Sequence, residues 1–470
     1  MMGPENPEKP SILIRGRLWF SDIPSKPLAK LRGVARQAIK LAKDDPRRLI
    51  HSLKVGLTVT LVSLLYYLQP LYNNLGASAM WAVMTVVVVF EFSVGGTIGK
   101  CLNRGLATLA AAALALGANH LSILSGGGNE PYVIGLFVFV QAVAMSFVRF
   151  FPKVKAKYDY GMLIFILTFS LVSISGLRMN EVIKLAQARL VTIVIGASTC
   201  LAVCILIYPV WAGEDLHNYV AKNISQLGNF LEGHMDQCFQ TSCDARIEIT
   251  KPSISNLNSI LVDSKGREET LANLAGWEPG HGQFMFRHPW KQYLKIGSLT
   301  RQCACRLEPI NGFLNSNIQL QAPQEIQCTI QEAFSESRKA LKELAWAIET
   351  MTKPSSANPH IANLKTASAN IKILLRSSIW GDESDSLQII PIAAVMIDMV
   401  SSVEQIGDAV NELSLMGKFK SRNGNESGVE GESEIGHDKN CIEIGMAEIS
   451  SLSVAIDERI EYSADEQILI

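Results

Sequence analysis

Charged side chains are scarce in one long segment of this sequence. Only 13 of the 158 residues from 55 to 212 are Asp, Glu, Lys or Arg, although the whole chain of 470 residues contains 19% charged residues. Ordinary globular domains contain roughly 25%. Because a segment with so little charge cannot face water over most of its surface, the sequence excludes a wholly soluble protein.

Several motif classes are also absent. The nine cysteines are odd in number and include no Cys-x-x-Cys pair, so we expect no disulfide framework and a reducing cytosol around the polar half. No phosphate-binding loop, dinucleotide fingerprint or His-Glu-x-x-His motif occurs, so we expect no enzyme and no cofactor. His281, His288, Cys303 and Cys305 match no common zinc spacing, so no metal site is expected.

The first residues lack the pattern of a cleaved signal peptide. Residues 1–51 contain no run of seven apolar residues, so we expect the later spans to drive membrane insertion. The basic amphipathic stretch from Leu28 to Lys43 has no interleaved aromatic residues, which argues against nucleic acid as a partner. It more simply rests on an anionic lipid surface.

Six apolar stretches are long enough to cross a membrane, which takes about 20 residues. The turn at Asn73-Asn74-Leu75-Gly76 separates the first two. The expected spans are 53–72, 77–93, 97–119, 131–148, 160–177 and 184–211. The sequence thus predicts an all-α membrane protein with six transmembrane helices.

The basic residues predict the orientation of these spans. Lys and Arg are frequent before the first span and in the connection 149–157, whereas the connection 120–131 has neither. The first two regions should therefore face the cytosol, with both chain termini cytosolic. On this topology the sequons at Asn223 and Asn425 are not glycosylated.

A few cations lie inside the expected spans, where burying a charge costs at least ~2.5–3.5 kcal/mol. Lys100, Arg104 and Thr108 repeat every four residues and share one helix face. Arg189 lies inside the sixth span, with Lys184 and Arg178 nearer its outer end. One interpretation is that the lysines reach the headgroups and Glu91 pairs with one base. The alternative is a basic water-filled pathway, as in anion-selective pores.

Aromatic residues gather near the expected span ends. Tyr66, Tyr67, Phe147, Phe150, Phe151, Tyr158 and Tyr160 belong to this group. An interfacial aromatic belt is the usual reading, and a hydrophobic gate is the alternative.

From residue 213 onward, apolar residues recur at helical spacing, for example at Leu216, Val220, Ile224, Leu227 and Leu231. This predicts a helical cytosolic domain, in which Trp277, Trp290 and Tyr293 are expected to be packing residues. The stretch 421–440 has the composition of a disordered segment. The expected domains are a basic cytosolic N-terminal segment (1–50), a transmembrane domain (51–212), a helical cytosolic domain (213–420) and a mostly disordered acidic tail (421–470).

Several stretches resemble the plant aluminium-activated malate transporter family. The clearest are AMWAVMTVVVVFEF at 79–92, GKCLNRGLATL at 99–109, KYDYGMLIFILTFSL at 157–171 and WEPGHGQFMFRHPWKQY at 277–293. The resemblance covers residues 45–310. It implies a homodimeric channel in which malate, chloride and nitrate pass near the two-fold axis, in the plasma membrane or alternatively the vacuolar membrane. The basic pore positions of the family fall on Lys100, Arg104 and Arg189.

The resemblance leaves gating and mechanism open. A carrier or exporter of aromatic organic acids, or a non-conducting scaffold, are the alternatives. Aluminium-responsive members of the family supply acids in the connection into the sixth span, whereas this chain has Asn180 and Lys184 there. We therefore expect gating by voltage or anions rather than strongly by aluminium, a hard cation that prefers carboxylates.

Overall fold

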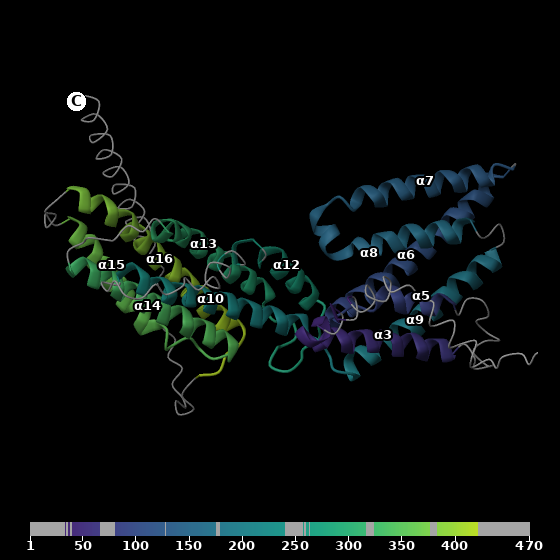
Figure 1. The fold of residues 1–470 in the computed structure, drawn as a ribbon. Coiled ribbons are helices and arrows are strands. Elements are labelled where there is room, and N and C mark those ends of the chain that lie inside the picture. The colour runs from purple at the N-terminus through teal and green to yellow at the C-terminus, as the bar shows by residue number, and fades with distance from the viewer. Residues whose placement is uncertain are drawn as a thin grey trace, which may run out of the picture. The chain divides into compact units, whose positions relative to one another are not determined.

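The computed structural model describes residues 40–65, 80–126, 128–174, 179–239, 264–315, 324–376 and 383–421, with isolated positions at 33, 36, 37, 257 and 260–262. Every named element in these ranges is an α-helix, and no strand occurs among them (Figure 1). This confirms the all-α class. The chain divides into two compact units, Met1–Lys420 and Ser421–Ile470, and all contacts described below lie in the first.

The apolar half of the chain, which we define as α3 to α9, consists of six described helices. They are α3 (Pro46–Leu65), α5 (Met80–Val89), α6 (Val94–Ser125), α7 (Glu130–Val148), α8 (Pro152–Ile174) and α9 (Met179–Leu206). Residues 66–79 between α3 and α5, which include the end of the first expected span, lie outside the described residues.

Five described helices are long and apolar enough to cross a membrane. They comprise Val94–Ser125, Glu130–Val148, Pro152–Ile174, Gln187–Leu206 and Ile390–Met416. The second expected span, 77–93, is instead a helix of 10 residues. It ends early because Ser93, in an extended conformation, caps the following helix and accepts a hydrogen bond from the Gly96 backbone nitrogen at 3.1 Å.

Helix α6 is the central element of the apolar half and packs against α7, α8 and α9. Its 32 residues span about 48 Å, so it extends beyond the expected span 97–119 at both ends. Buried Ala111, Ala115 and Ala118 of α6 pack against Phe169 and Val172 of α8. Small residues at such an interface let two helix backbones approach closely.

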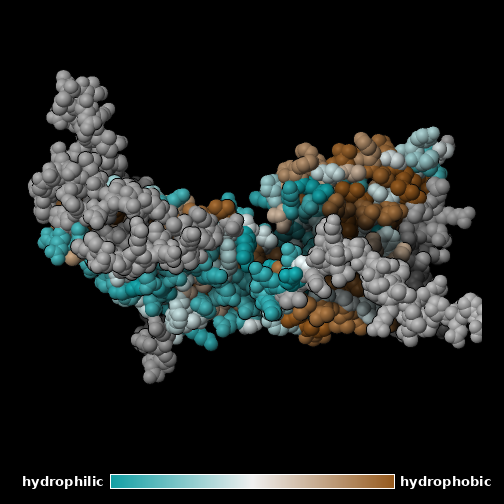
Figure 2. All heavy atoms as spheres, viewed as in Figure 1, coloured by the Kyte–Doolittle hydropathy of each residue, from teal (hydrophilic) through white to brown (hydrophobic). Residues whose placement is uncertain are grey.

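Helix α7 presents apolar side chains outward over most of its surface. Gln141 is its buried residue, whereas Leu136, Phe139 and Phe147 are each more than 60% exposed. The space-filling view shows this hydrophobic surface in brown over α7 (Figure 2). An apolar surface of this kind is stable when lipid covers it.

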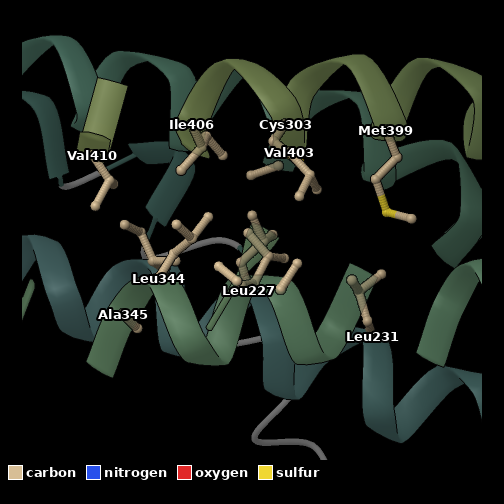
Figure 3. Close-up of a cluster of buried hydrophobic side chains, with 14 of the residues drawn as sticks. Leu227, Leu231, Cys303, Leu344, Ala345, Met399, Val403, Ile406 and Val410 are labelled. Atoms are coloured by element: carbon tan, nitrogen blue, oxygen red, sulfur yellow. The ribbon is translucent and has the colours of Figure 1, made fainter. Parts of the chain in front are cut away.

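The polar half, which we define as α10 to α16, forms a helical bundle around one apolar core. Its helices are α10 (Ala212–Phe239), α12 (Ser264–Ala275), α13 (Trp290–Asn315), α14 (Gln324–Glu349), α15 (Asn358–Arg376) and α16 (Glu383–Met416). Leu227 and Leu231 of α10 meet Leu344 of α14 and Val403 of α16 in this core (Figure 3). The helical spacing expected from 216 to 231 is confirmed, since all five residues of the pattern are buried.

Helix α16 satisfies the length and composition of a membrane span but packs against α13, α14 and α15. Met399, Val403, Ile406, Val410 and Leu413 along it are fully buried in the bundle core. A helix that is apolar on most sides is also what the centre of a helical bundle requires. We therefore interpret α16 as a core helix rather than a further span.

The segment that follows α12 touches both halves of the chain. The Glu278 carboxylate accepts hydrogen bonds from the backbone nitrogens of Ala212 at 2.7 Å and Gly213 at 3.0 Å, at the start of α10. Burial raises the pKa of Glu278, although these backbone N–H groups favour its charged form. A Cβ atom at Gly95 of α6 would collide with the Leu274 carbonyl oxygen, so α6 begins directly against this segment.

Trp277 also contacts the apolar half. Its ring lies edge-on to Tyr158 at 6.2 Å and beneath the Lys157 ammonium at 4.9 Å. A Cβ atom at Gly99 would lie 3.0 Å from the Trp277 ring. Trp277 was expected to pack inside the helical domain with Tyr293; Tyr293 is buried there, but Trp277 instead packs against α6 and α8.

We expect Glu278→Gln to destabilise the protein by about 1–3 kcal/mol, because an amide nitrogen would face a backbone N–H in a buried site. The measurement is the midpoint of thermal unfolding of the detergent-purified chain. Glu214→Gln is the matched control, since Glu214 lies exposed in the first turn of α10, the turn whose backbone nitrogens bind Glu278. Equal midpoints for the two variants would contradict the capping role.

Three buried polar side chains form a hydrogen-bonded group in the bundle. The Tyr293 hydroxyl lies 2.8 Å from His217 Nδ1 and 3.2 Å from His288 Nε2. Burial lowers the pKa of His217, and it lowers the pKa of His288 to about 4. Both imidazoles are therefore neutral at physiological pH.

The folded protein should lose stability between pH 6.5 and pH 4. Over this range the unfolded chain takes up a proton at position 288 and the folded chain does not, so folding becomes less favourable as pH falls. His288 alone accounts for roughly 3 kcal/mol at pH 4. Unfolding midpoints measured against pH should fall less steeply for His288→Gln, and an unchanged slope would show that His288 titrates normally.

Candidate functional site

The cations predicted inside the spans divide into two kinds of environment. Lys100 lies on α6 and forms an ion pair with Glu91, which belongs to the break between α5 and α6. Its ammonium also lies 5.5 Å from the Tyr160 ring centroid. Glu91 thus balances the charge of Lys100, as one interpretation of the sequence anticipated.

Arg104 lies one turn further along α6 and is 7% exposed. One terminal guanidinium nitrogen donates to the Tyr160 hydroxyl of α8 at 2.9 Å. Arg104 Nε and the Thr108 hydroxyl, one turn beyond, are buried without a hydrogen-bond partner among the described residues. Arg104 therefore has a neutral partner that leaves its charge uncancelled.

Arg189 of α9 is 6% exposed and stacks over an aromatic ring. Its guanidinium carbon lies 4.2 Å from the centroid of Trp81 on α5. Its Nε also has no hydrogen-bond partner among the described residues. A cation over an indole face gains about 0.5–2 kcal/mol, again without neutralisation by a carboxylate.

Arg104 and Arg189 face the same cavity, which we call the arginine pocket. The lining comes from four helices: Trp81 of α5, Arg104 and Thr108 of α6, Ile164, Leu167 and Thr168 of α8, and Arg189, Thr192 and Ile193 of α9. The cavity has a volume of about 10 Å³, close to the minimum that holds one water molecule. None of its lining residues is acidic.

The arginine pocket is electrostatically suited to an anion. A buried polar group without a partner costs about 1–3 kcal/mol, and a charged one costs more. Two guanidinium groups and a hydroxyl that converge without a carboxylate therefore leave donors for an incoming anion. In the conformation described, the cavity has room for a water molecule but not for a dicarboxylate.

Two predicted site residues cannot be placed. Arg178 and the side chain of Lys184 lie outside the described residues, as does the side chain of Glu181. The spatial relation of these residues to the arginine pocket therefore stays a prediction.

Two aromatic residues that contact the buried arginines were not assigned this role from the sequence. Tyr160 was assigned to the interfacial belt, yet its hydroxyl binds Arg104. Trp81 lies in a stretch that carries the family resemblance but was given no role. Both contacts join residues from different helices, so no local spacing reports them. An aromatic residue within a span could have been considered as the neutral partner of an arginine that has no acidic partner.

The residues weighed for a metal site are dispersed. His281 stacks on Trp211 with ring centroids 3.8 Å apart, and His288 binds Tyr293. Cys303 is buried in the bundle core and Cys305 is exposed. Within the described part of the chain, no group of three metal-ligating side chains converges.

Comparison with known proteins gives a consistent result. Residues 39–381 match the family model described as aluminium-activated malate transporter. Aluminum-activated malate transporter 2 of Arabidopsis thaliana is 46% identical over 404 residues, which is 84% of this chain and 80% of the relative. Aluminum-activated malate transporter 1 of Triticum aestivum is 42% identical over 402 residues, 83% of this chain and 86% of the relative.

Proposed function

The chain belongs to the aluminium-activated malate transporter family, and we propose that it is a channel that passes malate, chloride and nitrate across a plant membrane. Family membership also identifies a transporter rather than an enzyme, and the several apolar helices make it a multi-pass membrane protein. The observation that carries the proposal is the arginine pocket, where two buried guanidinium groups face one cavity without a carboxylate.

The proposed topology has six spans and a cytosolic polar half. Helices α3 and α5 with the undescribed residues 66–79 supply the first two spans, and α6 to α9 supply the other four. The exposed Lys153 at the start of α8 faces the cytosol under the positive-inside rule. Six spans return the polar half, including the apolar helix α16, to the same side.

The proposed assembly is a homodimer with the conduction pathway near its two-fold axis. A second copy doubles Lys100, Arg104 and Arg189 around one pathway, and the added positive potential favours a divalent anion. In this arrangement Arg104 and Arg189 supply the uncancelled charge. Lys100 with its partner Glu91 sits nearer to the cytosolic end of α6, and the contribution of Lys184 and Arg178 rests on the sequence alone.

A carrier or exporter of organic acids is the second candidate, because a small cavity of about 10 Å³ also suits a protein that opens to one side at a time. Single-channel recordings separate the two, since a carrier produces no unitary current steps. We propose the plasma membrane as the location, with the vacuolar membrane as the alternative.

Arg104→Gln and Arg189→Gln should each lower malate current by about tenfold, equivalent to roughly 1.4 kcal/mol of lost electrostatic stabilisation. Arg104→Lys should retain more current than Arg104→Gln but less than wild type, because an ammonium contributes its charge only in the fraction of channels where it stays protonated. The measurement is whole-cell current with malate on the cytosolic side, normalised to surface protein. Lys153→Gln, which removes an exposed cation, is the control and should conduct normally. Full malate current in both glutamine variants would place the pathway elsewhere.

Aluminium added outside should have little effect on this channel. The outer connections offer Glu130 and Glu181 as carboxylates, and Arg178 and Lys184 flank the second, so a trivalent cation is repelled there. Gating should instead follow voltage or anions. Whole-cell current is measured before and after micromolar aluminium at acidic external pH. A several-fold rise that Glu181→Gln abolishes would show that one carboxylate per subunit suffices.

A further inference from the structure

A second positively charged site lies in the polar half, remote in sequence from the arginine pocket. It is an open groove of about 490 Å³ between the start of α12 and the middle of α13, which pack side by side (Figure 1). Its lining residues are Lys265 of α12 with Ser298, Arg301, Gln302, Cys305 and Arg306 of α13. None of them is acidic, and we call this site the basic groove.

Two of the three cations in the basic groove keep their charge uncancelled. Lys265 is exposed and forms no ion pair with the described residues. The Arg306 guanidinium donates to the Ser402 hydroxyl at 2.7 Å and to the Asp398 backbone carbonyl at 3.0 Å. These acceptors are neutral and belong to α16, so they hold the guanidinium in place without removing its charge.

Arg301 plays a different role at the floor of the groove. Its guanidinium binds the Glu268 carboxylate and the Ser264 hydroxyl. The side chain of Glu268 is only 1% exposed, so this pair is buried and nearly neutral. It joins α12 to α13, the two helices that carry Lys265 and Arg306.

The groove therefore offers the Arg306 guanidinium and the Lys265 ammonium together with the Ser298 hydroxyl and the Gln302 amide. Planar guanidinium groups bind carboxylate and phosphate oxygens in pairs, and an ammonium adds a point charge. We propose that the basic groove binds a small anion with two negative charges, a dicarboxylate of the transported class, and that this occupancy regulates conduction. The regulatory part rests on the channel function proposed above.

A physical connection links the basic groove to the arginine pocket through α12. The 12 described residues of this helix span about 18 Å, with Lys265 at one end. At the other end of α12 the Leu274 carbonyl packs against Gly95, and the Trp277 ring just beyond the helix packs against Gly99. Both glycines lie in the first turns of α6, the helix that carries Arg104. If anion binding displaces α12, these contacts displace α6 with it, and Arg104 moves with α6.

The test uses inside-out patches from cells that express the full chain, with the cytosolic malate concentration varied and chloride as the current carrier. The double variant Lys265→Gln/Arg306→Gln should raise the malate concentration for half-maximal modulation of open probability by about tenfold. Its unitary chloride conductance should stay unchanged, because neither residue lines the arginine pocket. Lys291→Gln/Lys372→Gln removes the same charge from α13 and α15 outside the groove and should behave as wild type.

Three outcomes are distinguishable. If the wild type passes no anion current, the proposed channel function fails. If it conducts but the double variant keeps the wild-type malate dependence, the basic groove is not the regulatory site. Replacing malate by inorganic phosphate or adenosine monophosphate identifies the ligand chemistry. The dicarboxylate assignment would be overturned if phosphate or adenosine monophosphate modulates the wild type, the double variant abolishes that modulation, and malate has no effect.

Discussion

Two guanidinium groups in an apolar environment, with no carboxylate among the described residues beside them, constrain the arrangement of the helices around them. Each buried charge costs several kcal/mol, and the helices meet this cost with neutral partners: the Tyr160 hydroxyl for Arg104 and the Trp81 ring for Arg189. A hydroxyl and an aromatic face stabilise a cation without cancelling its field. An acidic partner would stabilise the cation equally well but would leave nothing for a mobile anion to bind.

Helix α6 joins this electrostatic arrangement to the rest of the chain. Ser93 fixes where the helix begins, and the alanines from 111 to 118 fix its contact with α8, which carries Tyr160. Its first turns lie against the segment Leu274 to Glu278, and Glu278 in turn caps α10. The position of Arg104 thus depends on packing in both halves. An interface this close, with glycine at two successive turns of α6, tolerates little sliding.

Much of this organisation could be predicted from the sequence because it depends on composition, period and burial cost. Low charge identified the apolar half, helical spacing identified Leu216 to Leu231 as core, and the cost of a buried charge singled out Arg104 and Arg189. The remaining features depend on contacts between helices. Lys100 meets Glu91 only because α5 stops early, and Trp81 reaches Arg189 only after α5 and α9 pack. Composition also cannot separate α16 from a membrane span, since a bundle centre and a bilayer select the same residues.

The choice of arginine over lysine follows from the same constraint. In a medium of low dielectric a lysine readily loses its proton and becomes neutral, whereas a guanidinium remains charged and can lie flat on an indole ring. Lys100, which is the more exposed cation, has a carboxylate partner, and the two deep positions without one are both arginine. Among the described residues, the deep positions without a carboxylate partner thus carry guanidinium groups, and the position that has one carries the ammonium. The arginine pocket therefore attracts an anion through two guanidinium groups that meet no carboxylate among its lining residues, and this attraction is a property of the fold.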